Sequence, residues 1–191
     1  MLLRFSVRNY RSLATEQEIL FTESGLTDDA RGLISVAGLS QRVLPVIAMY
    51  GPNASGKSNL LKAIGFVVSG VQDSYKKQPG RAINRRPFRL SKHDESDSTS
   101  MELDFIVKNF SIGAQTLNVR FTYGFKITDD YVEEEWLYAF PSGHRQVWFH
   151  RNRNESPEYY FGRALKGQNR VISGLTKPDA LFISMAQMNN H

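Results

Sequence analysis

The sequence has no cysteine among its 191 residues, which excludes disulfide bonds, cysteine–zinc sites and thiol catalysis. It also has no apolar run that approaches the length of about eighteen residues typical of a membrane-spanning helix. The first residues alternate apolar with basic side chains and contain no apolar block of the kind found in signal peptides. We therefore expect a cytoplasmic protein that does not enter a membrane.

Metal-binding patterns and sequence repeats are missing as well. The four histidines do not have the spacing of metal ligands, and they are His93, His144, His150 and His191. Internal repeats and low-complexity tracts are also absent from the sequence, which argues against a repeat architecture. With 41% hydrophobic residues, the chain is able to bury the core of one globular domain.

The strongest motif in the sequence is GPNASGKS at residues 51–58. It matches G-x-x-x-x-G-K-[ST], the Walker A or P-loop motif, whose backbone N–H groups curl around the phosphates of a nucleotide. Gly51 and Gly56 allow the tight turn and the close approach of the chain to the phosphates. Lys57 is expected to contact the β- and γ-phosphates, and Ser58 to bind a magnesium ion. The motif therefore predicts ATP and Mg²⁺ as cofactors.

The segments on both sides of the motif suit a phosphate-binding loop. Residues 44–50, LPVIAMY, form a short apolar run that predicts a strand buried on both faces. Residues 57–70 place their apolar side chains on one helical stripe. The N-terminal dipole and N–H groups of such a helix would point at the phosphates.

Other parts of the chain show strand patterns separated by turns. Residues 2–7 alternate and predict a strand that pairs with a second strand at 16–22. Residues 72–100 combine charge, proline and glycine, which predicts a long basic excursion on the surface. The later expected strands span residues 101–107, 115–128, 131–140, 145–151 and 179–184.

Four stretches, taken in order, resemble one protein family. They are LLRFSVRNYRSL, LPVIAMYGPNASGKSNLLKAI, EEEWLYAFPSGHRQVWFHR and LFISMAQMNNH. They look like the N-terminal half of AAA-type ATP-binding proteins of the abortive-infection and overcoming-lysogenization-defect group, which are SMC-like members of the ABC-type ATPases. The resemblance covers nearly the whole chain. It implies an α/β P-loop NTPase fold, the first lobe of an ABC/SMC-like head, with a mixed sheet and an antiparallel β-subdomain at residues 101–162.

The resemblance also implies roles for individual residues. In NYRSL, Arg11 and Ser12 match a turn whose basic residue leans toward the nucleotide, and a solvated arginine is the alternative. Asn53 matches an asparagine near the γ-phosphate and the attacking water of the opposing site. Gln187 matches a Q-loop glutamine that touches magnesium, and an ordinary loop glutamine is the alternative. The predicted nucleotide-binding residues are Arg11, Ser12, Gly51, Pro52, Asn53, Ala54, Ser55, Gly56, Lys57, Ser58 and Asn59, and the predicted magnesium ligands are Ser58 and Gln187.

Two elements of this family are missing from the sequence. A Walker B strand, four apolar residues followed by Asp-Glu, does not occur, and neither does the Ser-Gly-Gly helix start of the ABC signature. The carboxylates in MELDFIV and YVEEEWLY lack the apolar run before them. We therefore expect a chain that binds ATP without turning it over, with hydrolysis requiring a C-terminal lobe that is absent. The expected parts of this N-terminal lobe are residues 1–71 with the phosphate loop, 72–100 as the excursion, and 101–191 ending at a Q-loop-like strand.

For the intact protein, the resemblance implies a homodimer of ATPase heads in a bacterial anti-phage or DNA-repair-like assembly. In this family the effector is often a nuclease. Two alternatives of other classes stay open. A net charge of +5 and clustered basic residues suit nucleic-acid binding, although a solvated face is the simpler interpretation. The chain could also be a dimerisation module in which bound nucleotide is structural. The basic residues of the clusters are Lys76, Lys77, Arg81, Arg85, Arg86, Arg89, Lys92, His144, Arg145, His150, Arg151 and Arg153.

Overall fold

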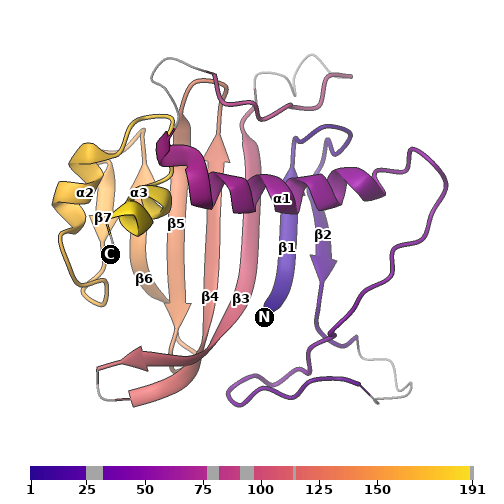
Figure 1. The fold of residues 1–191 in the computed structure, drawn as a ribbon, viewed down its shortest axis with the longest axis horizontal. Coiled ribbons are helices and arrows are strands. Elements are labelled where there is room, and N and C mark those ends of the chain that lie inside the picture. The colour runs from indigo at the N-terminus through magenta and orange to yellow at the C-terminus, as the bar shows by residue number, and fades with distance from the viewer. Residues whose placement is uncertain (25–31, 77–81, 91–96, 114, 190–191) are drawn as a thin grey trace.

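Seven strands form a single antiparallel sheet in the computed structural model, which describes residues 1–24, 32–76, 82–90, 97–113 and 115–189. The strand order is β2-β1-β3-β4-β5-β6-β7. Figure 1 shows the long helix α1 crossing one face of the sheet from the side of β2 toward β5, while α2 and α3 lie near β6 and β7. The helix that follows the phosphate-loop motif, α1, therefore covers one face of the sheet.

The elements follow one another along the chain with β1 and β2 first, α1 next and a run of five strands after it. Their bounds are β1 Leu2–Arg8, β2 Gln17–Leu20, α1 Lys57–Asp73, the 3₁₀ helix η1 Ser74–Lys76, β3 Thr99–Ile112, β4 Gln115–Ile127, β5 Val132–Phe140, β6 Gln146–Asn152, β7 Tyr159–Phe161, α2 Asn169–Leu175 and α3 Phe182–Met188. Within the described segments, no helix is both long enough and apolar enough to span a lipid bilayer.

The core lies between the sheet and α1. Phe5 and Val7 of β1 are buried, and so are Ala63 and Val67 of α1, all within one apolar cluster. Small and β-branched side chains on this stripe of α1 let the helix lie close to the aromatic face of the sheet. Burial of this kind stabilises the fold by about 25 cal/mol per Å² of apolar surface.

Two predicted strands are wrong. Residues 44–50 form no strand, and Val46 and Tyr50 are 78% and 94% exposed. The strand predicted at 179–184 is instead a turn that leads into α3. The apolar run at 44–50 has the composition of a buried strand, but the described part of the chain offers it no strand to pair with.

The mixed sheet is also wrong, because all neighbouring strands in the sheet are antiparallel. Residues 101–162 do not form a sheet of their own, since β1 joins β3 with Val7 opposite Met101. The strands predicted at 2–7, 16–22 and between 101 and 151 are confirmed within a few residues. Alternation of apolar and polar side chains is a local signal, whereas the pairing of strands depends on the tertiary structure.

The basic excursion predicted at 72–100 is in part a packed segment. Ile83 and Arg85 are buried, with 4% and 2% of their surfaces exposed. The Nε atom of Arg85 donates to Asp129 Oδ1 at 2.7 Å, and its guanidinium also donates to the carbonyl of Asp97. The segment around Arg85 is thus fastened to the end of the sheet. Lys77, Arg81 and Lys92 of the predicted cluster lie outside the described residues.

A buried carboxylate joins the sheet to α3. Glu135 of β5 is fully buried, and its oxygens accept hydrogen bonds from Tyr123 Oη at 3.0 Å and from the backbone N–H groups of Phe182 and Ile183 at 2.6 and 3.1 Å. These two N–H groups belong to the first turn of α3, so Glu135 satisfies donors that the helix itself leaves without partners. Burial raises the pKa of the Glu135 carboxyl. This contact stabilises the first turn of α3.

We predict that Glu135→Ala lowers the free energy of unfolding by about 3 kcal/mol, because it leaves three buried donors without an acceptor. Urea denaturation followed by circular dichroism measures the change. Glu133→Ala, on the same strand but only half-buried, serves as the control and should stay within about 0.5 kcal/mol of the wild type. Equal losses in the two variants would contradict the structural role of Glu135.

The raised pKa of Glu135 predicts a dependence of stability on pH. An acid with a higher pKa in the folded state contributes most below the unfolded value, about 4.3 for glutamate, and this contribution is lost as pH rises through the folded pKa. Glu135→Gln removes the titrating group. The stability of wild type relative to Glu135→Gln should therefore fall as the pH is raised from 4 toward neutrality, measured by urea denaturation at each pH. A constant difference between the two proteins would show that the pKa of Glu135 is not raised.

Candidate nucleotide-binding site

The phosphate-loop motif forms a turn that leads directly into α1. Gly56 is the residue before the helix and has φ 96°, a left-handed conformation that favours glycine. A Cβ atom at this position would lie 3.4 Å from both Ser12 Oγ and Leu13 Cδ2. Gly56 is therefore favoured by its backbone conformation, and a side chain here would touch the turn that follows β1 at ordinary contact distance.

The start of α1 is open to an anion. Among the described residues, no side chain caps its N-terminus, and its first turn contains no acidic residue. The N-terminus of a helix with 17 residues carries a partial positive charge and N–H groups that the helix does not use. Phosphate groups bind readily at such a position.

Lys57 places a positive charge inside the turn. Its Nζ atom donates to the carbonyl oxygens of Gly51 and Pro52, each at 2.7 Å, and lies 3.2 Å from Ser55 Oγ. These partners are exchangeable, because a phosphate oxygen is a stronger acceptor for an ammonium group than a neutral carbonyl. Ser58 is exposed in the first turn of α1, so its hydroxyl is available to a magnesium ion held between the phosphates.

The turn predicted to contact the nucleotide lies beside the loop. Asn59 Nδ2 donates to Ser12 Oγ at 2.8 Å, which fixes this turn to the first turn of α1. Arg11 has φ 54° and donates its backbone N–H to the carbonyl of Arg86 at 2.7 Å. Its Nε atom is buried and has no hydrogen-bond partner among the described residues. The structure therefore brings Arg11, Ser12 and Asn59 together with the phosphate loop.

Gln187 lies elsewhere in this structure. Helix α3 packs against the C-terminal end of α1, where Leu181 N donates to Ser74 Oγ at 3.1 Å and Tyr75 N donates to Ser184 Oγ at 3.3 Å. Ser58 is at the opposite end of α1 (Figure 1), and a helix of this length extends about 25 Å. The structure does not bring Gln187 and Ser58 to one magnesium ion, so their shared role stays a prediction without geometric support.

The carboxylates in the two acidic strands are engaged in the sheet. Asp104 accepts a hydrogen bond from Thr122 Oγ1, and Glu134 pairs with Lys126 at 2.6 Å and with His150 at 2.9 Å. Within the described segments, no group of three or more His, Asp or Glu side chains could hold a metal ion. None of these residues therefore substitutes for a Walker B acid in the geometry that we observe.

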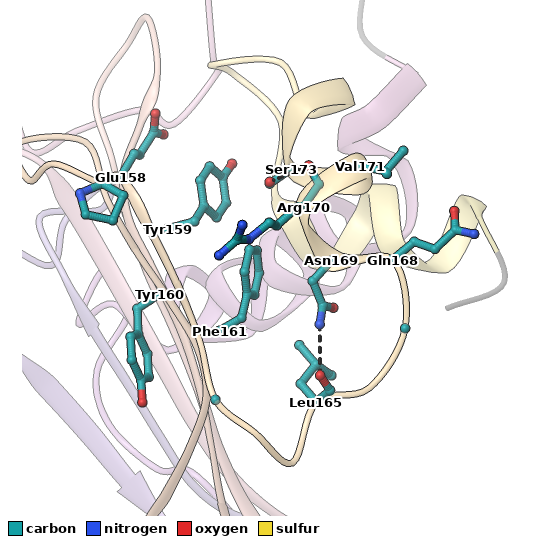
Figure 2. A pocket seen from close by; sticks show the side chains of 13 residues that line it. Glu158, Tyr159, Tyr160, Phe161, Leu165, Gln168, Asn169, Arg170, Val171 and Ser173 are labelled. Atoms are coloured by element: carbon teal, nitrogen blue, oxygen red, sulfur yellow. Dashed lines mark hydrogen bonds between the residues drawn. The ribbon is translucent and has the colours of Figure 1, made fainter.

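Two cavities lie at opposite ends of the sheet. The larger, about 1020 Å³, lies between β7 and α2, where Tyr159, Phe161 and Arg170 line it (Figure 2). The other, about 610 Å³, adjoins the phosphate loop and includes Arg86 and Arg89 in its wall. Both arginines belong to the basic cluster for which the sequence left nucleic-acid binding and a solvated face open, and only the NYRS turn marked this side of the loop.

Comparison with known families agrees with this geometry. A family model described as "AAA domain, putative AbiEii toxin, Type IV TA system" matches residues 46–173, which include the phosphate loop, α1 and most of the sheet. No match was found among curated proteins. Since the matched region covers about two thirds of the 191 residues, the chain belongs to this family and carries an AAA-type, ATPase-like nucleotide-binding domain.

Proposed function

We propose that this chain is the ATP-binding lobe of an ABC/SMC-like ATPase that acts in the cytoplasm in anti-phage defence or a DNA-repair-like assembly. The observation that carries the proposal is the start of α1, which no described side chain caps, with Lys57 beside a turn that ends at a left-handed Gly56. The defence role is supported by the description of the matched family, which names a toxin of a type IV toxin–antitoxin system.

The residues present suit a magnesium-bound triphosphate. The N–H groups of the loop and of the first turn of α1 would bind phosphate oxygens, and Lys57 would exchange its two carbonyl partners for the β- and γ-phosphates. Ser58 would hold the magnesium ion, whose charge offsets that of the phosphates. Arg11, whose buried Nε atom has no hydrogen-bond partner among the described residues, would supply a further donor.

Apolar surface around the loop supports a site that is completed by another lobe. Val46 and Tyr50 before the loop are 78% and 94% exposed, and Leu61 and Val68 on the outer side of α1 are 58% and 49% exposed. Leu61 and Val68 are seven residues apart and share one face of α1, and exposed apolar residues of this kind are typical of a contact surface. A parallel strand beside residues 44–50, followed by a Walker B acid, would cover this surface and supply the missing carboxylates.

Two further features of the intact protein belong to this proposal. A homodimer of heads would place Asn53, which is exposed at the tip of the loop, near the γ-phosphate of the opposing site. ATP binding would then hold the heads together and control an effector such as a nuclease. The nucleic-acid alternative is weakened, because Arg85 and Arg151 are both buried at 2% exposure and pair with Asp129 and Glu158.

We predict that the chain binds Mg-ATP and that Lys57→Ala costs about 2–5 kcal/mol of binding free energy, because it removes the charge that faces the phosphates. Titration with a fluorescent ATP analogue measures the affinity. Lys62→Ala changes an exposed lysine on the same helix and should bind as the wild type does. Equal affinities of the wild type and Lys57→Ala would refute the proposed site.

We also predict that the chain alone releases phosphate from ATP at a rate near background. Removing one group that stabilises a transition state costs a factor of about a hundred to a thousand in rate, and both Walker B carboxylates are missing from the described geometry. A phosphate-release assay with Lys57→Ala as the control tests this. Sustained release that Lys57→Ala abolishes would mean that Asp104 or one of residues 133–135 performs the reaction.

A further inference from the structure

The cavity beside the phosphate loop begins where α1 begins. Its inner wall is the turn at Arg11 and Ser12 together with Asn59, and its outer wall is built by residues between 84 and 90. Ser12 Oγ, which accepts the hydrogen bond from Asn59, lies 3.4 Å from the place that a Cβ of Gly56 would occupy. Through Ser12 and Asn59 the cavity therefore adjoins the turn at which phosphates would bind.

The outer wall of the cavity is held in place by buried polar contacts. Asn9, 1% exposed, accepts a hydrogen bond from Phe88 N at 2.9 Å through its side-chain oxygen. Arg85 ties the same segment to Asp129, and the carbonyl of Arg86 accepts the backbone N–H of Arg11. Three separate contacts therefore fix the backbone from which the side chains of this wall project.

The chemistry of the cavity combines positive charge with flat apolar surface. Arg11, Arg86 and Arg89 line it, and the wall between the last two contains Pro87 and the half-buried ring of Phe88. Guanidinium groups bind phosphate oxygens and also stack on aromatic bases, and aromatic rings stack on bases as well. A volume of about 610 Å³ lies within the usual range for small-molecule sites, about 300–1,000 Å³.

We propose that this cavity is the nucleoside compartment of the nucleotide site. Arg11 and Ser12 stand at its phosphate end, while Arg86, Phe88 and Arg89 enclose the base and ribose. The loop alone binds only the phosphate chain, so these residues decide how strongly a nucleoside triphosphate is preferred over an inorganic polyphosphate. The inference rests on the proposed function, since it requires that phosphates occupy residues 51–58.

Comparing ATP with inorganic triphosphate tests the inference, because inorganic triphosphate lacks the base and ribose. The affinities of both ligands, with magnesium, are measured by calorimetry for the wild type and for the double variant Arg86→Gln/Arg89→Gln. Salt of about 0.15 M limits long-range attraction to a Debye length of about 8 Å. Arg163→Gln, an exposed arginine beyond β7, is the matched control, and thermal unfolding verifies that each variant is folded.

The inference predicts that the double variant binds ATP about tenfold more weakly, as expected for the loss of stacking and charged contacts, and inorganic triphosphate as the wild type does. Lys57→Ala should weaken the binding of both ATP and inorganic triphosphate. An unchanged ATP affinity in the double variant, or an equal loss of affinity for the two ligands, would overturn the inference. Neither result would affect the proposal that the loop binds phosphates.

Two other results would also count against the inference. Loss of binding to a single-stranded oligonucleotide, with ATP affinity unchanged, would assign Arg86 and Arg89 to a nucleic-acid backbone. If the wild type binds neither ATP nor inorganic triphosphate, the proposed function itself fails, and the nucleoside compartment fails with it.

Discussion

The packing of α1 on the sheet is the contact on which the candidate site depends. Within the described residues, the segment before the loop is hydrogen-bonded beside β2 only as far as Leu44, whose N–H donates to the carbonyl of Phe21 at 2.8 Å. The loop itself is therefore positioned from its C-terminal side by α1. Ala63 and Val67 are almost completely buried against the sheet, and Phe66 contacts the ring of Tyr10 at a centroid distance of 5.6 Å. A shift of α1 along the sheet would separate Ser12 from Asn59 and would open both the loop and the cavity beside it.

Several polar side chains that are far apart in sequence hold this arrangement together. Asn9 binds the wall that carries Phe88, Arg85 binds Asp129, and Glu135 caps α3 at the other end of α1. The first two contacts connect the irregular segment 82–90 to the ends of β1 and β4, and the third connects the first turn of α3 to β5. The sheet thus fixes the positions of the cavity wall and of the last helix, whereas no described side chain makes a comparable contact at Val46 or Tyr50.

The sequence predicted local features well and long-range ones poorly. The phosphate loop follows from eight consecutive residues, and the strands between 101 and 151 follow from alternation and turn residues. The run at 44–50 was mistaken for a buried strand, because composition says nothing about whether a partner strand exists. Residues 179–184 were mistaken for a strand because the acceptor that caps α3, Glu135, lies 47 residues away from Phe182. The basic composition around Arg85 favours a solvated segment, and its burial depends on Asp129, 44 residues later in the chain.

Amide hydrogen exchange of the chain with and without Mg-ATP tests the central claim most directly, because it locates the bound nucleotide without a mutation. The account predicts slower exchange at residues 51–60 and in the turn at Arg11 and Ser12, with the central strands β3 to β5 unchanged. Slower exchange confined to residues 157–173, which surround the larger cavity near β7, would place the nucleotide elsewhere. That result, or unchanged exchange throughout residues 51–60, would contradict the account.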